Sequence, residues 1–177
     1  MNRLSLRIVG AQGQGVFSVG DICAKGLKRE GYCVLGYREY MSLIKGGHSS
    51  YQLDIDTVMV RSPTKTVKAV LTFNYQGLTR YFDDLEEGGY LIHDVPDWQF
   101  GEADQKRLEE KKIRVVYVPT EAILKELDAP LVMQNVIFSS VLWKALGQEK
   151  GVLREMVREQ FATKPKLIDL NLACVDR

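Results

Sequence analysis

The feature that most constrains the fold is a short apolar run that leads directly into clustered glycines. Leu4 to Val9 has the composition of a buried strand, and the segment Gly10-Ala11-Gln12-Gly13-Gln14-Gly15 follows at once. Residues 16–29 then carry apolar side chains at helical spacing. This order predicts a strand, a tight loop and a helix, in which the loop amides point at whatever lies above the strand end.

A second glycine-bearing segment, Lys45-Gly46-Gly47-His48, comes about thirty residues later. It follows a second expected strand over residues 32–37 and precedes an alternating polar and apolar run over 51–55. Residues 38–50 are therefore expected to form a polar loop. Both loops are expected to open on the same edge of one sheet, and this makes that edge a candidate ligand site or docking surface.

The rest of the chain alternates strand and helix patterns up to residue 127 and is helical after it. Residues 58–60 are expected to pair with 51–55 as a hairpin, and Gly88-Gly89 is expected to end a helix over 74–85. Further strands are expected at 67–73, 90–93 and 113–118, and further helices at 102–111, 120–127, 132–146, 151–161 and 165–174. The prediction is one α/β domain over residues 1–177, with three layers, a mostly parallel sheet, helices on both faces, a small antiparallel hairpin and a helical C-terminal tail.

Composition excludes several classes of function. A formal net charge of +1 gives no global field for nucleic acid or an anionic membrane. No apolar stretch approaches the roughly 18 residues that span a bilayer, and the N-terminus lacks a signal-peptide pattern, so a cytoplasmic protein is expected. Cys23, Cys33 and Cys174 are fewer than the roughly four thiolates of an iron–sulfur cluster and are expected to be buried apolar thiols.

Neither loop matches a familiar catalytic motif. Glycines at 10, 13 and 15 give G-x-x-G-x-G, whereas dinucleotide-binding folds carry G-x-G-x-x-G, and no Gly-Lys-Ser/Thr follows as in a P-loop. The first loop is therefore either a ligand loop or a tight turn that needs glycine only for its backbone. His48, with an intrinsic pKa of about 6.5, is either an acid–base group or an exposed loop residue. The sequence assigns no catalytic residue and no metal site.

Taken together, the segments resemble the gamma domain of the 2-oxoacid:acceptor (pyruvate/2-oxoglutarate:ferredoxin) oxidoreductases. That family shows G-x-G-G-Q-G after its first strand, similar to residues 10–15, and a Tyr-Arg-Glu-Tyr segment leading to Ser-x-Ile-Arg-Gly-Gly-His, similar to residues 37–48. Asn74 at the end of a strand, Gln134-Asn135-Val136 and Asn171-Leu172 also fit the family. Two positions depart from its pattern: Gln12 replaces a glycine, and Lys45 replaces an arginine.

The resemblance implies a gamma subunit that supports the coenzyme A-dependent oxidative decarboxylation of a 2-oxoacid, similar to 2-oxoglutarate or pyruvate. Thiamine diphosphate and iron–sulfur clusters are expected on partner alpha and beta subunits, with a delta subunit as an optional addition, and ferredoxin receives the electrons. No cofactor is expected on this chain alone, and coenzyme A is the candidate ligand at its edge. The candidate site residues are Gly10, Gly13, Gln14, Gly15, Lys45, Gly46, Gly47 and His48.

Two alternatives stay open at this point. The chain is an assembly module whose glycine loops pack on a neighbouring subunit without touching a ligand, or it is a stand-alone nucleotide-binding protein. The first alternative predicts loss of complex formation when a loop glycine is enlarged. The second predicts tight nucleotide binding by the purified chain.

Overall fold

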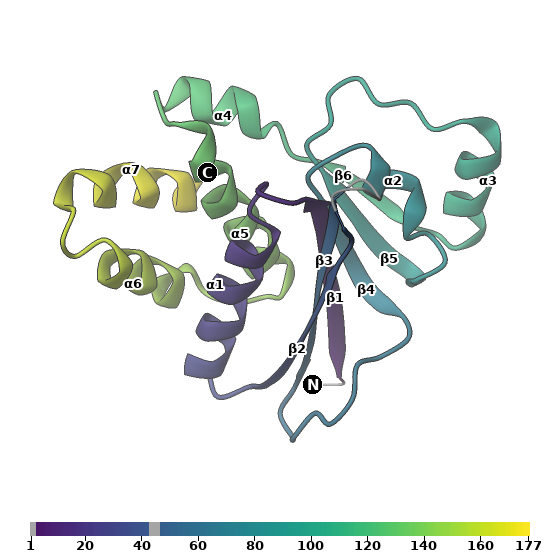
Figure 1. The fold of residues 1–177 in the computed structure, drawn as a ribbon, viewed down its shortest axis with the longest axis horizontal. Helices are drawn as coiled ribbons and strands as arrows, with labels where there is room; N and C mark the ends of the chain where they lie inside the picture. Colours follow the sequence, from purple (N-terminus) through teal and green to yellow (C-terminus); the bar gives the residue numbers. More distant parts are fainter. Residues whose placement is uncertain (1–2, 43–46) are drawn as a thin grey trace.

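A computed structural model describes residues 3–42 and 47–177, whose strands form one six-stranded sheet in the order β2-β3-β1-β4-β5-β6 (Figure 1). The strands are β1 (Leu4–Ala11), β2 (Cys33–Tyr40), β3 (His48–Asp56), β4 (Val67–Thr72), β5 (Leu85–His93) and β6 (Arg114–Tyr117). The helices are α1 (Val16–Arg29), α2 (Gln76–Arg80), α3 (Glu102–Glu110), α4 (Thr120–Glu126), a 3-10 turn η2 (Leu131–Met133), α5 (Gln134–Ala145), α6 (Lys150–Gln160) and α7 (Pro165–Asp176).

The sheet is mostly parallel, as predicted. Strands β1, β4, β5 and β6 run in one direction. Strand β3 is antiparallel to both of its neighbours, β1 and β2. The carboxyl end of β1 therefore lies beside the amino end of β3, where Ala11 pairs with His48.

Alternation along β1 divides the core into two apolar clusters, one on each face of the sheet. Leu6 and Ile8 join a large cluster with buried side chains from α1, α5, α6 and α7. Val9 points to the other face and joins a smaller cluster with Leu78 of α2 and Leu108 of α3. Figure 1 shows these two helical layers on opposite sides of the sheet, which confirms the predicted three-layer arrangement.

The expected hairpin between residues 51–55 and 58–60 is wrong. The antiparallel element consists of β2, β3 and β1, and residues 58–60 lie outside any strand, with Met59 71% exposed. Strand β3 looks half-exposed in sequence because polar residues alternate along it, but it is an interior strand. Its Asp54 is fully buried and accepts hydrogen bonds from Ser5, Gln52 and Thr64. The polar side chains of β3 are buried because they hydrogen-bond to other buried side chains, and therefore do not need exposure to solvent.

The helix expected over residues 74–85 is also wrong in extent. Helix α2 is a single turn and a half, and Leu85 already begins β5. Gly88 and Gly89 lie inside this strand, beside a register shift against β4, instead of ending a helix. A Cβ on Gly89 would lie 2.9 Å from the backbone oxygen of Lys68, so glycine serves close approach of two backbones there.

The helical C-terminal tail is confirmed. Helices α5, α6 and α7 pack on one another and on α1, on the face of the sheet opposite α2 and α3 (Figure 1). Trp143 of α5 is among the largest fully buried side chains of this layer. Over the described ranges, no helix has the length and apolar character needed to cross a membrane.

Candidate functional site

The first glycine loop presents the N-terminus of α1 at the carboxyl edge of the sheet. Gly13 and Gly15 adopt φ angles of 89° and 92°, which a residue with a Cβ rarely adopts. Gly15 is the N-cap of α1 and offers no side chain to cap the helix. The first amides of a 14-residue helix are thus directed at the space above the loop, where they favour an anionic group.

The two loops meet at one edge of the sheet, the edge on which both are predicted to open. The backbone N–H of Gln12 donates to the carbonyl of Gly47 at 2.8 Å, and the Gln12 side-chain amide donates to the carbonyl of Met41 at 3.0 Å. Gln12 has no positive φ, so the replacement of a family glycine by glutamine costs the backbone nothing here. Its side chain instead ties the first loop to the segment that follows β2.

Gln14 links the loop after β1 to the loop after β4. Its side-chain oxygen accepts from the backbone N–H of Ala11 at 2.7 Å and from the amide of Asn74 at 3.1 Å. Helix α1, which follows β1, covers one face of the sheet, and α2, which follows β4, covers the other. The connections therefore change face between β1 and β4, and ligands of such sheets usually bind in a crevice at this point. Gln14 therefore shapes that crevice, and Gly10 leaves room for it because a Cβ there would lie 3.0 Å from the Gln14 oxygen.

A hollow of about 210 Å³ lies above the α1 N-terminus. Ser49 of β3 contributes to its wall, and its hydroxyl is buried with no hydrogen-bond partner in the described part of the chain. A buried unpaired hydroxyl is costly, and a hydrogen bond to a ligand atom would relieve that cost. The hollow is lined by Ala11, Gln12, Gly13, Gly15, Val16, Phe17, Ser18 and Ser49.

Ser49 is the residue that sequence reasoning missed. The sequence predicts a loop over residues 38–50 that includes Ser49, and this is wrong at both ends, because β2 continues to Tyr40 and β3 begins at His48. Once β3 is known to begin there, alternation puts Ser49 on the face of α1 and its two neighbours on the other face. This alternation could have identified Ser49 from the sequence, but only with β3 starting at His48. The preceding glycines indicated a loop there instead.

Asn135 of α5 lies against the first glycine loop at Gly15. A Cβ on Gly15 would overlap the Asn135 side-chain amide, so these two residues touch across the loop. The segments that carried the family resemblance thus converge, since Asn74 holds Gln14 and Asn135 contacts Gly15. Asn171, by contrast, is buried and donates to the carbonyl of Leu167 inside α7.

His48 does not lie in this hollow. It is the first residue of β3 and only 4% exposed, which corrects the expectation of a loop histidine. Its Nε2 lies 2.7 Å from the hydroxyl of Tyr81, on the face of α2. Burial and the nearby Arg80 guanidinium lower the His48 pKa, so the imidazole is neutral at physiological pH.

The remaining predicted site residues divide in two groups. Lys45 and Gly46 fall outside the residues that the structure describes. Gly47 is described, with a φ of 58°, and contributes backbone atoms to the contact between the loops. Of the expected set, the structure brings together Gly10, Gly13, Gln14, Gly15 and Gly47 at one edge.

No group of three or more histidine, cysteine, aspartate or glutamate side chains suited to a metal ion occurs within residues 3–42 and 47–177. The three cysteines form no disulfide: Cys23 and Cys174 are buried, and Cys33 is half-buried. Burial raises the Cys23 pKa to about 12, so this thiol stays protonated. The expectation of buried apolar thiols is confirmed for two of the three.

A scan of protein families matches residues 5–177 to the model described as pyruvate ferredoxin/flavodoxin oxidoreductase. The chain belongs to this family. A curated member, the alpha subunit of 2-oxoacid:ferredoxin oxidoreductase 2 from Aeropyrum pernix, is 30% identical over 210 residues, which cover 97% of this chain and 32% of that protein. This oxidoreductase-family chain therefore spans about a third of the length of that relative.

Solved structures share the fold of this oxidoreductase-family chain. The 2-oxoglutarate:ferredoxin oxidoreductase from Magnetococcus marinus, solved with 2-oxoglutarate, coenzyme A and succinyl-CoA bound, superposes with a TM-score of 0.84 at 22% identity, over 99% of this chain and 30% of that one. The gamma subunit of a keto/oxoacid ferredoxin oxidoreductase from Geobacter sulfurreducens superposes with a TM-score of 0.75 at 18% identity, over 98% of this chain and 94% of that one.

Proposed function

We propose that this chain is the gamma-type subunit of a cytoplasmic 2-oxoacid:ferredoxin oxidoreductase, which oxidatively decarboxylates a 2-oxoacid and transfers the acyl group to coenzyme A. Thiamine diphosphate and the iron–sulfur clusters belong to partner alpha and beta subunits, with delta as an optional further subunit, and ferredoxin accepts the electrons. Family membership over residues 5–177 supports the reaction class. The gamma subunit of Geobacter sulfurreducens, which the chain covers over 94% of its length, supports the role of a separate subunit.

The hollow above the α1 N-terminus is the proposed contact with coenzyme A, which supplies the thiol that receives the acyl group. One observation carries this part of the proposal: the Ser49 hydroxyl is buried and unpartnered in the described chain at the mouth of a helix N-terminus. A phosphate oxygen would accept hydrogen bonds from that hydroxyl and from the helix amides. Lys45 and Gly46 are proposed to approach the same phosphates from the second loop.

The first experiment tests the subunit role. An affinity pull-down of this chain from its native cell extract, read by mass spectrometry, is expected to recover a thiamine diphosphate-dependent subunit and an iron–sulfur subunit. Recovery of the chain alone, or only as a homo-oligomer, would contradict the proposal and favour a stand-alone binding protein.

The second experiment tests the contact with coenzyme A in the assembled enzyme. Ser49→Ala removes one hydrogen bond to the ligand, so the KM for coenzyme A should rise by about three- to tenfold, with little change in the KM for the 2-oxoacid. Ser140→Ala is the matched control, because its hydroxyl already donates to the carbonyl of Val136 within α5. An unchanged KM for coenzyme A in the Ser49→Ala enzyme would remove Ser49 from the contact.

The isolated chain supplies a further check on Ser49. Removal of an unpaired buried hydroxyl takes away a desolvation cost, so Ser49→Ala should leave the melting temperature equal or slightly higher. A clear loss of stability would show that the hydroxyl has an internal structural role, and would contradict its assignment to a ligand.

A further inference from the structure

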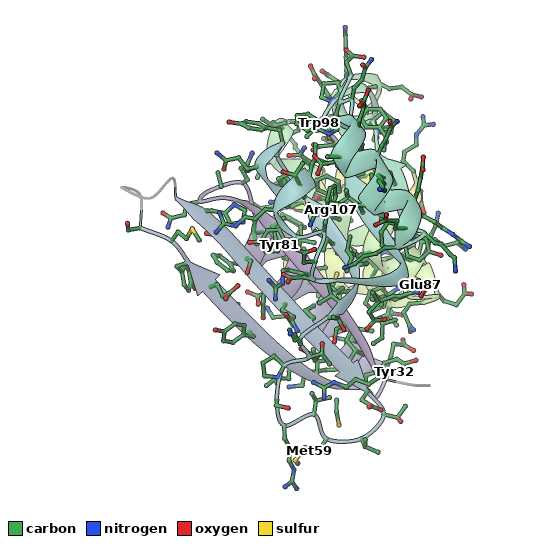
Figure 2. The ribbon with its side chains drawn as sticks, turned by 90° about the vertical axis from the view of Figure 1, so that its right-hand side faces the viewer. Tyr32, Met59, Tyr81, Glu87, Trp98 and Arg107 are labelled. Atoms are coloured by element: carbon green, nitrogen blue, oxygen red, sulfur yellow. The ribbon has the colours of Figure 1, made fainter. Side chains whose placement is uncertain are left out.

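A second, polar hollow of about 310 Å³ lies on the opposite face of the same sheet edge. It sits between the end of β2, the start of β3 and the end of α2, on the side of the molecule that faces the viewer in Figure 2, where Tyr81 is labelled. Consecutive β3 residues separate the two hollows, because Ser49 lines the first and His48 and Ser50 line this one. Its wall consists of Arg7, Glu39, Tyr40, Met41, His48, Ser50, Arg80 and Tyr81.

Arg80 supplies this hollow with a guanidinium, and the Glu39 carboxylate lines the same wall. Its guanidinium contacts the sulfur of Met41 at 3.6 Å and has no carboxylate partner within the described ranges. Arg7, the other guanidinium, is already held by Asp84 at 2.9 Å and by the Gln52 side chain at 2.6 Å. The Arg7 guanidinium is therefore fixed in the wall and its charge is largely neutralised, so Arg80 is the cation that remains to bind a ligand.

The His48–Tyr81 pair leaves one hydrogen-bond donor unused. Burial lowers the His48 pKa and raises the Tyr81 pKa, so both groups are neutral and carry one N–H and one O–H between them. Their contact, Nε2 to Oη at 2.7 Å, consumes one of these protons. If the imidazole donates, the Tyr81 hydroxyl proton remains; if the hydroxyl donates, the proton on Nδ1 remains. Nδ1 has no partner in the described chain.

We propose that this hollow binds a small organic carboxylate. The Arg80 guanidinium pairs with the carboxylate, whose planar geometry fits the guanidinium fork, and the unused donor of the His48–Tyr81 pair supplies a neutral hydrogen bond. Glu39 at the wall, whose carboxylate accepts from Ser50 at 2.6 Å, repels a second negative charge on the bound group. A singly charged carboxylate is therefore preferred to a phosphate dianion. This inference goes beyond the proposed function and does not depend on it.

Histidine NMR on the full-length isolated chain tests the inference, since the sequence has only two histidines, His48 and His93. Acetate, propionate and inorganic phosphate are titrated separately at constant ionic strength. Acetate and propionate should shift the His48 ring signals in a saturable way, with a dissociation constant on the order of 1 mM, and leave the His93 signals in place. Phosphate should bind at least about tenfold more weakly.

Arg80→Gln should weaken the propionate titration by about tenfold or more, and the fold should survive because Arg80 is exposed. Arg61→Gln is the matched control, because Arg61 is an exposed arginine in the segment that follows the far end of β3. The inference is overturned if His48 shows no saturable shift with either carboxylate, if Arg80→Gln binds propionate as tightly as the parent chain, or if phosphate binds as tightly as acetate. Ser49→Ala, which alters the first hollow, should leave this titration unchanged, so the two proposals fail separately.

Discussion

Replacement of Gly15 by alanine isolates the contact that closes the α1 N-terminus. Gly15 has a φ of 92°, so alanine pays the left-handed backbone cost of about 1–2 kcal/mol. Its new Cβ would also overlap the Asn135 side chain, which adds an overpacking cost of about 1–3 kcal/mol. Gly13→Ala is the matched control, because Gly13 has a φ of 89° and nothing within 4 Å of its Cβ position. The two variants therefore differ by the Asn135 overlap and by the smaller cost of alanine at the N-cap of α1.

Thermal unfolding of the isolated chain measures this difference. For a chain of 177 residues, 1 kcal/mol corresponds to about 2–4 °C, so an overlap of about 2 kcal/mol places Gly15→Ala about 4–8 °C below Gly13→Ala. Adding Asn135→Ala to Gly15→Ala should recover that difference, measured against Asn135→Ala alone as in a double-mutant cycle. Equal melting temperatures for the Gly13 and Gly15 variants, or no recovery in the double variant, would refute the reasoning.

Three further predictions follow from buried and loop residues. Asp54→Asn should lower the free energy of unfolding at pH 7 by about 3 kcal/mol. Burial works to raise the Asp54 pKa, but the hydrogen bonds that the carboxylate accepts lower this pKa overall, so the carboxylate stabilises the fold above the ordinary pKa of 3.8 and this stabilisation is lost as pH falls through the lower folded-state pKa. The difference in stability between parent and variant, measured by denaturant titration, should therefore close over the same fall in pH. With a thiol reagent at pH 8, only Cys33 should react in the native chain, and Cys23 and Cys174 only after denaturation; rapid native labelling of Cys23 would contradict its burial. Lys45→Ala should raise the KM for coenzyme A in the assembled enzyme, and an unchanged value would remove Lys45 from the proposed site.

Much of the fold could be predicted where local pattern and local structure coincide. Helix α1 was expected over residues 16–29 and occupies Val16–Arg29, because apolar spacing, the preceding glycine loop and Gly31 after its end all act within a few residues. The parallel strands and the C-terminal helices were predicted for the same reason. The pairing of 51–55 with 58–60 was wrong because alternation predicts that a strand exists, and leaves its neighbours undetermined.

The candidate site was predictable in its backbone and unpredictable in its side chains. The glycine spacing placed Gly10 to Gly15 correctly at the edge of the sheet, and the contact of Gln12 with Gly47 puts the second loop at the same edge, as predicted. The partners of those loops, Asn74 and Asn135, come from segments about 60 and 120 residues away, and only a family resemblance connected them with the loops.

By itself, the sequence determined the elements whose causes are local: the strand, glycine loop and helix at the start, the alternation of strands with helices, and the helical end. The tertiary structure decided everything that depends on strand neighbours. Insertion of β3 between β1 and β2 buried Asp54, turned His48 toward Tyr81 and left the Ser49 hydroxyl facing the α1 N-terminus. The physical reason is that side chains alternate along a strand with a period of two, so their environment depends on which strands and helices cover each face, and those contacts join residues far apart in the chain.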